Sequence, residues 1–180
     1  MKILMLNGSP RLNGNTKTAL NAIAEGFGKN VQNEVEIIDV CQKNIKGCVA
    51  CESCKFNGGK CVLGDDSVDI MEKIYECDVL ILGTPVYWWG MSGQLKLLVD
   101  KFYSKALPFH KQDKKVGIVA VGASGVDDIQ YNLISQQFAC IFKSLKWQIV
   151  FDEAASAFEI GELSKSQQAI EKFSELWKKF

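Results

Sequence analysis

Histidine is almost absent from the sequence, which has only His110 among its 180 residues. A single histidine excludes a hydrolytic metal site built on a histidine pair, and no Ser-His-Asp set can be assembled around it. His110 lies in a connection that also contains lysine and proline, so we expect it to be a solvated loop residue. Hydrolytic chemistry of these two kinds is therefore not expected.

An excess of charge of one sign is also lacking. Lysine and arginine together number 21, and so do aspartate and glutamate, which gives a formal net charge of zero. The basic residues gather in no block larger than the pairs 114–115 and 178–179. Because nucleic-acid binding depends on neutralising phosphates, we expect no nucleic-acid surface.

Long apolar stretches are missing as well. No run of about 18 apolar residues is present that could span a bilayer. The first apolar run, Ile3–Leu6, is shorter than the roughly 7–15 residues of a signal-peptide core. We therefore expect a cytoplasmic protein with no membrane partner. The count of seven cysteines is odd, which excludes a fully paired disulfide framework within one chain and favours thiols or metal ligands.

The sequence does contain a regular alternation of strand and helix patterns. We expect a single domain over residues 1–180, without repeats or linkers. Apolar runs predict strands at 3–6, 35–40, 79–82, 116–121 and 147–151. Helical spacing of apolar residues predicts helices around 19–27, 68–75, 91–102, 134–145 and 170–180. This order predicts an α/β fold, a parallel sheet with helices on both faces and right-handed crossovers.

Four connections between these elements carry the candidate functional residues. One is a cysteine-rich insertion over residues 41–64, followed by Asp65 or Asp66 as a cap of the next helix. Open parallel sheets bind ligands beyond the carboxyl ends of their strands. This rule places the candidate site in the loops 7–16, 84–93 and 122–128.

The first of these loops, Asn7–Thr16, leads from a buried strand into a helix N-terminus, where free N–H groups and the helix dipole favour an anion. It lacks the G-x-G-x-x-G of a dinucleotide fold and the lysine of a G-x-x-x-x-G-K-[ST] loop. It offers instead one cation and several hydroxyl and amide groups, from Arg11 and from Ser9, Asn15, Thr16 and Thr18. We predict a site for one terminal phosphate; the alternative is that these residues only cap the helix.

Three consecutive aromatic residues, Tyr87, Trp88 and Trp89, occupy the second loop. Polar residues are usual in such turns, so a flat aromatic ligand would explain the rings. Pro85 and Gly90 fix a backbone that can approach such a ligand closely. The alternative is that the two tryptophans fill the core or a subunit interface.

The insertion carries four cysteines at a regular spacing, C-x2-C-x2-C-x6-C, formed by Cys48, Cys51, Cys54 and Cys61. Thiolates at this spacing can converge on one inorganic centre, and four of them complete the ligand set of an iron–sulfur cluster. Structural zinc fits less well, because its all-cysteine sites usually use two C-x-x-C pairs separated by a longer span. Free thiols or an adventitious metal are the remaining alternative.

Other polar residues are expected to be structural. Cys77 and Cys140 lie on or near predicted helices, where they are most simply buried small apolar residues. Asp127 and Asp128 precede a predicted helix and are expected to cap it rather than to act in catalysis.

The two loop motifs together resemble a known family. The segments Asn7–Thr16 (NGSPRLNGNT) and Gly83–Lys96 (GTPVYWWGMSGQLK) look like those of the flavodoxin-like NAD(P)H-dependent FMN reductases, and the resemblance runs from Lys2 to about Gly125. The cysteine spacing resembles the iron–sulfur flavoprotein branch of that family. The resemblance implies a flavodoxin-like five-stranded parallel sheet of order 2-1-3-4-5, with the cysteine-rich insertion after the second strand.

The resemblance also implies residue roles. FMN phosphate would be held by Ser9, Arg11, Asn13, Asn15 and Thr16. The ribityl chain and flavin ring would contact Pro85, Val86, Tyr87, Trp88 and Trp89. Backbone N–H groups at Gly122 and Ser124 would reach the pyrimidine edge of the ring, and a [4Fe–4S] cluster would be held by Cys48, Cys51, Cys54 and Cys61.

The expected function is that of an FMN-dependent oxidoreductase. Electrons would pass between NAD(P)H or a ferredoxin-like protein and an acceptor through the cluster, with the chemistry carried by the flavin and no catalytic side chain. Relatives of this kind are usually dimers or tetramers, so a homodimer or homotetramer is expected. Alternatives are a cluster-free FMN or quinone reductase, a non-enzymatic flavodoxin-like carrier, and a dinucleotide enzyme with Asp39 on the ribose, which the missing glycine motif disfavours.

Overall fold

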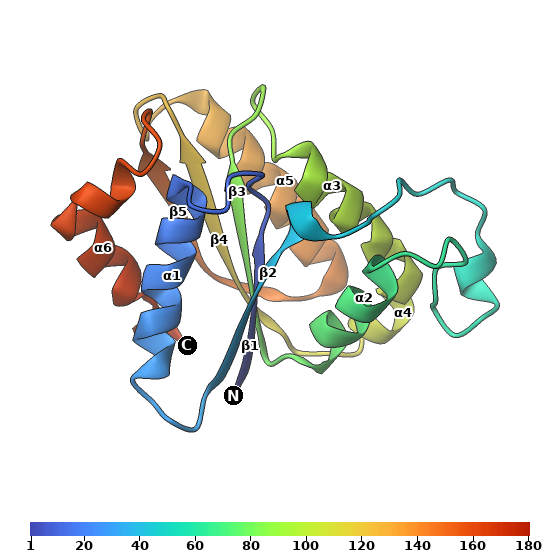
Figure 1. The fold of residues 1–180 in the computed structure, drawn as a ribbon. Coiled ribbons are helices and arrows are strands. Elements are labelled where there is room, and N and C mark those ends of the chain that lie inside the picture. Colours follow the sequence, from blue (N-terminus) through green and yellow to red (C-terminus); the bar gives the residue numbers. More distant parts are fainter.

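The computed structural model describes residues 1–180 and contains one parallel sheet of five strands in the order β2-β1-β3-β4-β5. The strands are β1 (Lys2–Asn7), β2 (Glu34–Asp39), β3 (Val79–Pro85), β4 (Lys115–Gly122) and β5 (Gln148–Ser156) (Figure 1). The predicted sheet and its flavodoxin-like order are confirmed.

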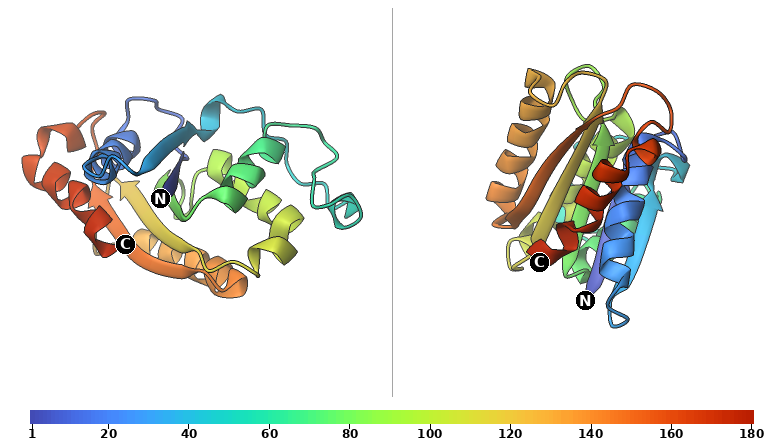
Figure 2. Two further views of the ribbon diagram at one scale, coloured as in Figure 1. Left: turned by 90° about the horizontal axis from the view of Figure 1, so that it is seen from below. Right: turned by 90° about the vertical axis from the view of Figure 1, so that its left-hand side faces the viewer.

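Six α-helices flank this sheet, and none is long and apolar enough to cross a bilayer. They are α1 (Asn15–Gly28), α2 (Ser67–Glu76), α3 (Gly93–Val99), α4 (Ala106–Phe109), α5 (Ile129–Leu145) and α6 (Gln167–Ser174). One apolar cluster joins α1 and α6 to one face of the sheet, and a second joins α2, α3 and α5 to the other. Figure 2 shows the resulting three layers, which confirm helices on both faces.

The central strand β1 shows why the sheet forms. Ile3 and Met5 belong to the apolar cluster on the α1 side, whereas Leu4 and Leu6 belong to the opposite cluster. Alternate residues of a strand point to opposite faces, so the continuous apolar run buries both faces at once. Such runs are typical of parallel strands covered by helices.

Three predicted elements have the wrong ends. The helix predicted over 91–102 begins at Gly93, with the Ser92 hydroxyl accepting the Leu95 N–H (3.2 Å), and continues after Val99 as the 3-10 helix η3 (Asp100–Lys105). The last predicted helix, 170–180, is α6 followed by a 3-10 helix over 176–179. Strand β5 runs to Ser156 rather than to residue 151, because β4 pairs with it as far as Gly122.

Two residues also differ from expectation. Cys140 is exposed on α5, although Cys77 is buried as predicted. His110 is half-buried at the end of α4, with its Nδ1 atom 2.5 Å from the Ala106 carbonyl oxygen, so it is not a solvated loop residue. The sequence pattern did not predict the short helix α4. This helix places the His110 ring beside the carbonyl of Ala106 in its first turn.

The cysteine-rich insertion leaves the sheet after β2 and returns at α2 (Figure 1). It projects from the side of the molecule opposite α6, as the left view of Figure 2 shows. None of the residues from 41 to 64 is buried. The insertion therefore has no apolar core of its own.

Candidate functional site

A cleft opens at the carboxyl ends of the strands, where the topology rule places it. Its walls come from the β1–α1 loop, the β3–α3 loop, the end of β4 and the segment after β5. The lining residues are Ser9, Arg11, Gly14, Asn15, Thr16, Pro85, Val86, Tyr87, Val121, Gly122, Ala123, Ala157 and Phe158. The structure thus brings the three predicted loops together around one cavity and adds a fourth segment.

The N-terminus of α1 faces this cleft with free donors. The N-cap is Gly14, which has no side chain to bond the first turn, and that turn holds no acidic residue. The first backbone bond of the helix runs from the Thr18 N–H to the Gly14 carbonyl (3.0 Å). The N–H groups of residues 15–17 consequently remain available, and with the helix dipole they favour an anion. The reading in which the polar side chains merely cap the helix is wrong.

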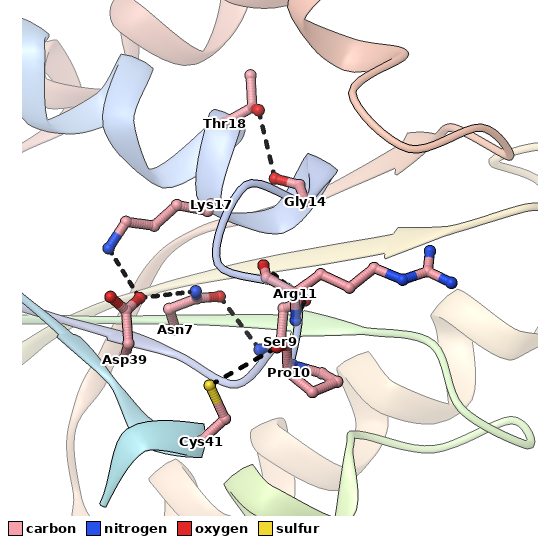
Figure 3. Close-up of polar contacts among 9 residues, drawn as sticks. All are labelled: Asn7, Ser9, Pro10, Arg11, Gly14, Lys17, Thr18, Asp39 and Cys41. Carbon is pink, nitrogen blue, oxygen red and sulfur yellow. Dashed lines mark hydrogen bonds and ion pairs between the residues drawn. The ribbon is translucent and has the colours of Figure 1, made fainter.

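The β1–α1 loop is fixed by short internal bonds (Figure 3). The Ser9 N–H donates to Asn7 Oδ1 (3.1 Å), and the Arg11 N–H donates to Ser9 Oγ (3.2 Å). The Arg11 guanidinium extends away from these bonds in Figure 3 and lines the cleft. A positive side chain and the free N–H groups therefore share one end of the cavity.

Asp39 is held by two neighbours at the end of β2 (Figure 3). Its Oδ1 atom accepts hydrogen bonds from Asn7 Nδ2 (2.9 Å) and from Lys17 Nζ (2.7 Å). The carboxylate thus fastens β1 and α1 to β2. Together with the observed strand order, this structural use argues against the dinucleotide alternative that assigned Asp39 to a ribose.

Three polar residues in or near the first loop either bond to other parts of the chain through their side chains or lie outside the cleft. The Asn15 side chain donates to the Glu159 carbonyl (2.8 Å) and accepts the Leu163 N–H (3.0 Å), so it ties α1 to the segment after β5. The Thr18 hydroxyl turns back onto the Gly14 carbonyl (3.3 Å). Asn13 is exposed and does not line the cleft, whereas Thr16 is buried and does.

The aromatic loop is a two-residue turn closed by Tyr87 and Gly90. Two backbone bonds, of 2.9 and 3.1 Å, join these residues in both directions. Trp88 and Trp89 at the tip have φ values of +47° and +60°, a left-handed region that non-glycine residues rarely adopt. Their side chains are 91% and 52% exposed, which excludes the core alternative and leaves a ligand or a subunit interface. Neither indole lines the cleft itself.

Below the tip, this loop is tied firmly to its neighbours. Thr84 Oγ1 accepts the Ser92 N–H (2.9 Å), and the Ser92 hydroxyl donates to the Gly8 carbonyl (2.6 Å). The Val86 N–H donates to the Val121 carbonyl (2.8 Å). A Cβ atom at Gly8 would lie 2.8 Å from Leu95 Cβ, so only glycine allows this approach.

In the third loop, Gly122 and Ala123 line the cleft and Ser124 does not. The Ser124 carbonyl instead accepts the Tyr131 hydroxyl (2.7 Å). Asp128 accepts the Gln130 N–H (3.0 Å) and caps α5, as predicted.

The segment after β5 was missed from the sequence. Ala157 and Phe158 line the cleft, and Phe158 is 74% exposed. Glu162 Oε2 accepts the N–H groups of Phe158 (2.7 Å) and Glu159 (2.8 Å), which closes the segment into a compact turn. A strand predicted to stop at residue 151 could not carry the chain as far as the cleft.

The four insertion cysteines line a second pocket together with residues of η3. The lining is Cys48, Val49, Ala50, Cys51, Glu52, Cys54, Cys61, Val62, Leu63, Asp100, Lys101, Tyr103 and Ser104. No three His, Cys, Asp or Glu side chains of the chain lie close enough to hold a single metal ion. Hydrogen bonds from Ser53 lower the pKa of the Cys51 thiol, which favours its thiolate.

The backbone around the cysteines is unusually constrained. Ala50 and Glu52, which lie between the first three cysteines, have left-handed φ values of +52° and +59°. Gly59 has a φ of +81°, and a Cβ atom there would lie 2.7 Å from the Ser104 carbonyl oxygen. The insertion therefore packs its backbone directly against η3.

Two aspartates close the neck of the insertion. Asp66 accepts the Asn44 N–H (2.7 Å) and returns its own N–H to the Asn44 carbonyl (3.1 Å). Asp65 accepts the N–H groups of Lys46 (2.8 Å) and Ser67 (3.0 Å), the latter in the first turn of α2. Of the two predicted caps, the Asp65 side chain makes the capping bond, whereas the Asp66 side chain makes no bond to the helix.

A buried lysine connects this neck to the cysteine pocket. Lys101 on η3 is 2% exposed, with Nζ lying 3.3 Å from Cys61 Sγ and 3.4 Å from Asp65 Oδ2. Burial alone would lower the pKa of Lys101, but the Cys61 sulfur and the Asp65 carboxylate hold it above its usual value. Lys101 is therefore a buried cation beside a sulfur.

Comparison with known proteins shows which family this chain resembles. A profile described as NADPH-dependent FMN reductase matches residues 1–156. The chain is 43% identical over 129 residues to the iron-sulfur flavoprotein MJ1083 of Methanocaldococcus jannaschii, covering 69% of this chain and 63% of that protein. It is 39% identical over 101 residues to an iron-sulfur flavoprotein of Archaeoglobus fulgidus, covering 56% of this chain and 48% of that protein. The chain thus spans about half to two thirds of the length of these two relatives.

Two further matches cover nearly the whole chain. The putative NAD(P)H-dependent FMN-containing oxidoreductase YwqN of Bacillus subtilis is 31% identical over 187 residues, covering 99% of this chain and 98% of that protein. The structure of the Trp repressor binding protein from Bacillus subtilis superposes with a TM-score of 0.71 at 26% identity, covering 97% and 98% of the two chains. Because the family profile spans all three predicted loops, the chain belongs to the NADPH-dependent FMN reductase family.

Proposed function

We propose that the protein is an FMN-dependent oxidoreductase that passes electrons between NAD(P)H, or a ferredoxin-like donor, and an acceptor. The observation that carries this proposal is the cleft, in which an anion-binding helix end and an apolar wall meet at the carboxyl ends of the strands. Family membership supports FMN as the occupant. A [4Fe–4S] cluster in the insertion is the second redox group of the proposal.

The residues of the cleft fit FMN. Its phosphate would be held by the Ser9 and Arg11 loop and by Thr16, with the N–H of Asn15 contributing in place of its occupied side chain. Pro85, Val86 and Tyr87 would lie along the ribityl chain and ring, with Trp88 and Trp89 at the rim and Gly122 and Ser124 toward the pyrimidine edge. Four of the proposed contacts do not line the cleft in this structure: Asn13, Trp88, Trp89 and Ser124.

Bound flavin supplies hydride and single-electron chemistry, and the protein supplies binding and orientation. Arg11 and Tyr87 are the only ionisable side chains that line the cleft. No carboxylate, histidine or cysteine lies there to serve as a general base. The proposed role of the chain is therefore to hold the phosphate, position the ring and leave one of its faces open to a donor.

The four cysteines fit a cluster better than a single ion. Each cysteine of a four-iron cluster binds a different iron, so the sulfurs stand farther apart than those around one ion. This geometry agrees with a pocket that all four cysteines line but in which no three ligands converge on one point. The names of the iron-sulfur flavoproteins also support a cluster, while zinc and free thiols remain as alternatives for the test.

Self-association is part of the proposal. The exposed Trp88 and the exposed apolar residues Ile129 and Leu133 on α5 would suit a homodimer or homotetramer. All seven cysteines are free, which suits a reducing compartment such as the cytoplasm.

Anaerobic purification followed by absorbance spectroscopy tests both redox groups. We expect flavin and cluster bands together, four irons and four acid-labile sulfides per chain, and steady-state oxidation of NADH or NADPH. A flavin-loaded protein that turns over neither nucleotide would favour the flavodoxin-like carrier. Turnover without iron would favour the cluster-free FMN or quinone reductase. Unchanged iron content in Cys54→Ala would reject the ligand assignment.

A further inference from the structure

We propose that Lys101 raises the reduction potential of the centre held by the four cysteines, by donating a hydrogen bond to the Cys61 sulfur. This inference rests on the cluster in the proposed function. It assigns a role to a residue outside both the cysteine motif and the flavin cleft. Lys101 is a positioning and tuning residue in this proposal, not a catalytic one.

The contact is short and enclosed. Lys101 Nζ lies 3.3 Å from Cys61 Sγ, within hydrogen-bond distance for sulfur, and the side chain is 2% exposed. Water therefore screens this cation little, and its field acts on the sulfur almost directly. An unpaired buried ammonium would lower the stability of the fold. Lys101 therefore needs negatively charged partners in the pocket.

Asp65 fixes the position of this cation. Its Oδ2 atom lies 3.4 Å from Lys101 Nζ, and the carboxylate is itself held by the N–H groups of Lys46 and Ser67. The Lys101 ammonium therefore contacts both the Asp65 carboxylate and the Cys61 sulfur. Because the same aspartate closes the neck of the insertion, the ammonium keeps its place relative to Cys61.

The sign of the effect follows from charge. Reduction adds an electron to a centre already surrounded by four thiolates, so it increases the negative charge of the pocket. A hydrogen bond and a positive charge at one sulfur stabilise the reduced state more than the oxidised state. Loss of Lys101 must consequently make the centre harder to reduce.

A neighbouring lysine provides a matched control. Lys105 also lies on η3 and is nearly buried (8% exposed), but its Nζ pairs with Glu72 (2.7 Å) rather than with a sulfur. Lys105→Met therefore removes a charge of the same kind from the same element without removing a bond to a cysteine. Lys101→Arg retains the charge at the tested position.

The test is a redox titration of the full-length, anaerobically purified protein, followed by electron paramagnetic resonance of the cluster. In Lys101→Met we expect at least a tenfold lower ratio of reduced to oxidised cluster at a fixed potential, about 59 mV for one electron. The cluster potential should be unchanged in Lys105→Met and close to wild type in Lys101→Arg. The flavin potential in the same samples should not move.

The outcomes separate this inference from the proposed function. Absence of iron and sulfide from the wild-type protein would overturn both. A normal cluster whose potential is the same in Lys101→Met and wild type would overturn only the role of Lys101. If Lys101→Met retains no iron, Lys101→Gln takes its place. Failure of both neutral variants to hold a cluster that Lys101→Arg holds would show a structural role and overturn the tuning.

Discussion

Trp88 and Trp89 combine an unfavourable backbone with exposed side chains. Both residues adopt left-handed φ values, yet their rings project into solvent from a turn that glycine and asparagine would form more easily. Such conformations cost of order 1–3 kcal/mol each, and they cluster at ligand-binding sites. The turn thus maintains two exposed indoles at the expense of stability.

Replacing this pair should separate stability from function. We expect Trp88→Asn combined with Trp89→Gly to raise the free energy of unfolding of the FMN-free protein by about 1–2 kcal/mol, since Asn-Gly suits this turn. Urea denaturation measures the gain, and the same variant should oxidise NAD(P)H more slowly. Phe56→Asn is the control, because Phe56 is equally exposed but has an ordinary φ of −111°. Equal stability of wild type and double variant would refute strain at the tip.

Glu153 gives a pH-dependent prediction at the same scale. Burial raises the pKa of this carboxyl, but Lys172 and Lys179 outweigh that effect and hold it below its ordinary 4.5. A depressed pKa stabilises the fold above the unfolded pKa, and this stabilisation is lost as the pH falls through the folded value. Glu153→Gln should therefore cost roughly 0.5–1 kcal/mol at pH 7, and progressively less as the pH falls through the folded pKa.

Thermal unfolding of Glu153→Gln and wild type across pH 3–7 measures this effect. Glu25→Gln is the control, because Glu25 is exposed on α1 and makes no ion pair. A stability difference that persists undiminished at the lowest pH would contradict the ion-pair explanation.

At the scale of elements, Asn15 joins the first turn of α1 to the segment that follows β5. Its side chain makes one bond to the Glu159 carbonyl and one to the Leu163 N–H. These two bonds position Phe158, which forms a wall of the cleft. A residue expected to bind phosphate through its side chain thus also builds the opposite side of the site.

Asn15→Ala should loosen that wall. We expect a loss of roughly 1–2 kcal/mol in unfolding free energy for two hydrogen bonds, faster amide hydrogen exchange at Leu163, and weaker FMN binding measured by fluorescence quenching. Asn21→Ala is the matched control, since Asn21 is exposed on the same helix and lies outside the cleft. Unchanged exchange at Leu163 would show that the segment holds its conformation without Asn15.

The same region shows what the sequence could and could not predict. Strands β1 and β3 are covered on both faces, so their apolar runs identify them directly. Strand β5 lies at the sheet edge, and Asp152 and Glu153 interrupt its apolar pattern, which hides its second half. Phe158 was missed for this reason.

The sequence predicted which loops form the cleft, but not which of their side chains face it. Helix ends and strand ends place the three loops correctly, because these depend on local pattern and on the topology rule. Whether a side chain faces the cleft depends on contacts distant in sequence. Asn15, bonded to a residue 144 positions away, and Ser124, bonded through its carbonyl to Tyr131, show why residue roles could not be read from spacing.

At the scale of the whole molecule, the insertion and the sheet differ in how they are stabilised. The sheet has two apolar clusters, whereas no residue from 41 to 64 is buried. Polar clamps at the neck and contacts with η3 hold the insertion in place. A bound cluster would supply the stabilisation that an apolar core supplies elsewhere.

Removal of iron should therefore affect the insertion alone. After chelation under reducing, anaerobic conditions, we expect trypsin to cut rapidly at the exposed lysines of the insertion, Lys43, Lys46, Lys55 and Lys60. The sheet should keep its circular dichroism and its flavin binding. Mass spectrometry of the fragments, with untreated protein as the control, locates the cuts. Equal cleavage with and without iron would mean that the cluster does not stabilise the insertion.

The closed neck makes the insertion a replaceable part. Asn44 and Asp66 meet through two backbone-directed bonds, so the chain enters and leaves the insertion at nearly the same point. Lengthening or shortening a loop between fixed ends changes its closure entropy only slowly. A redox centre could thus be gained, lost or exchanged by exchange of this one segment, while the strand register that forms the flavin cleft stays the same.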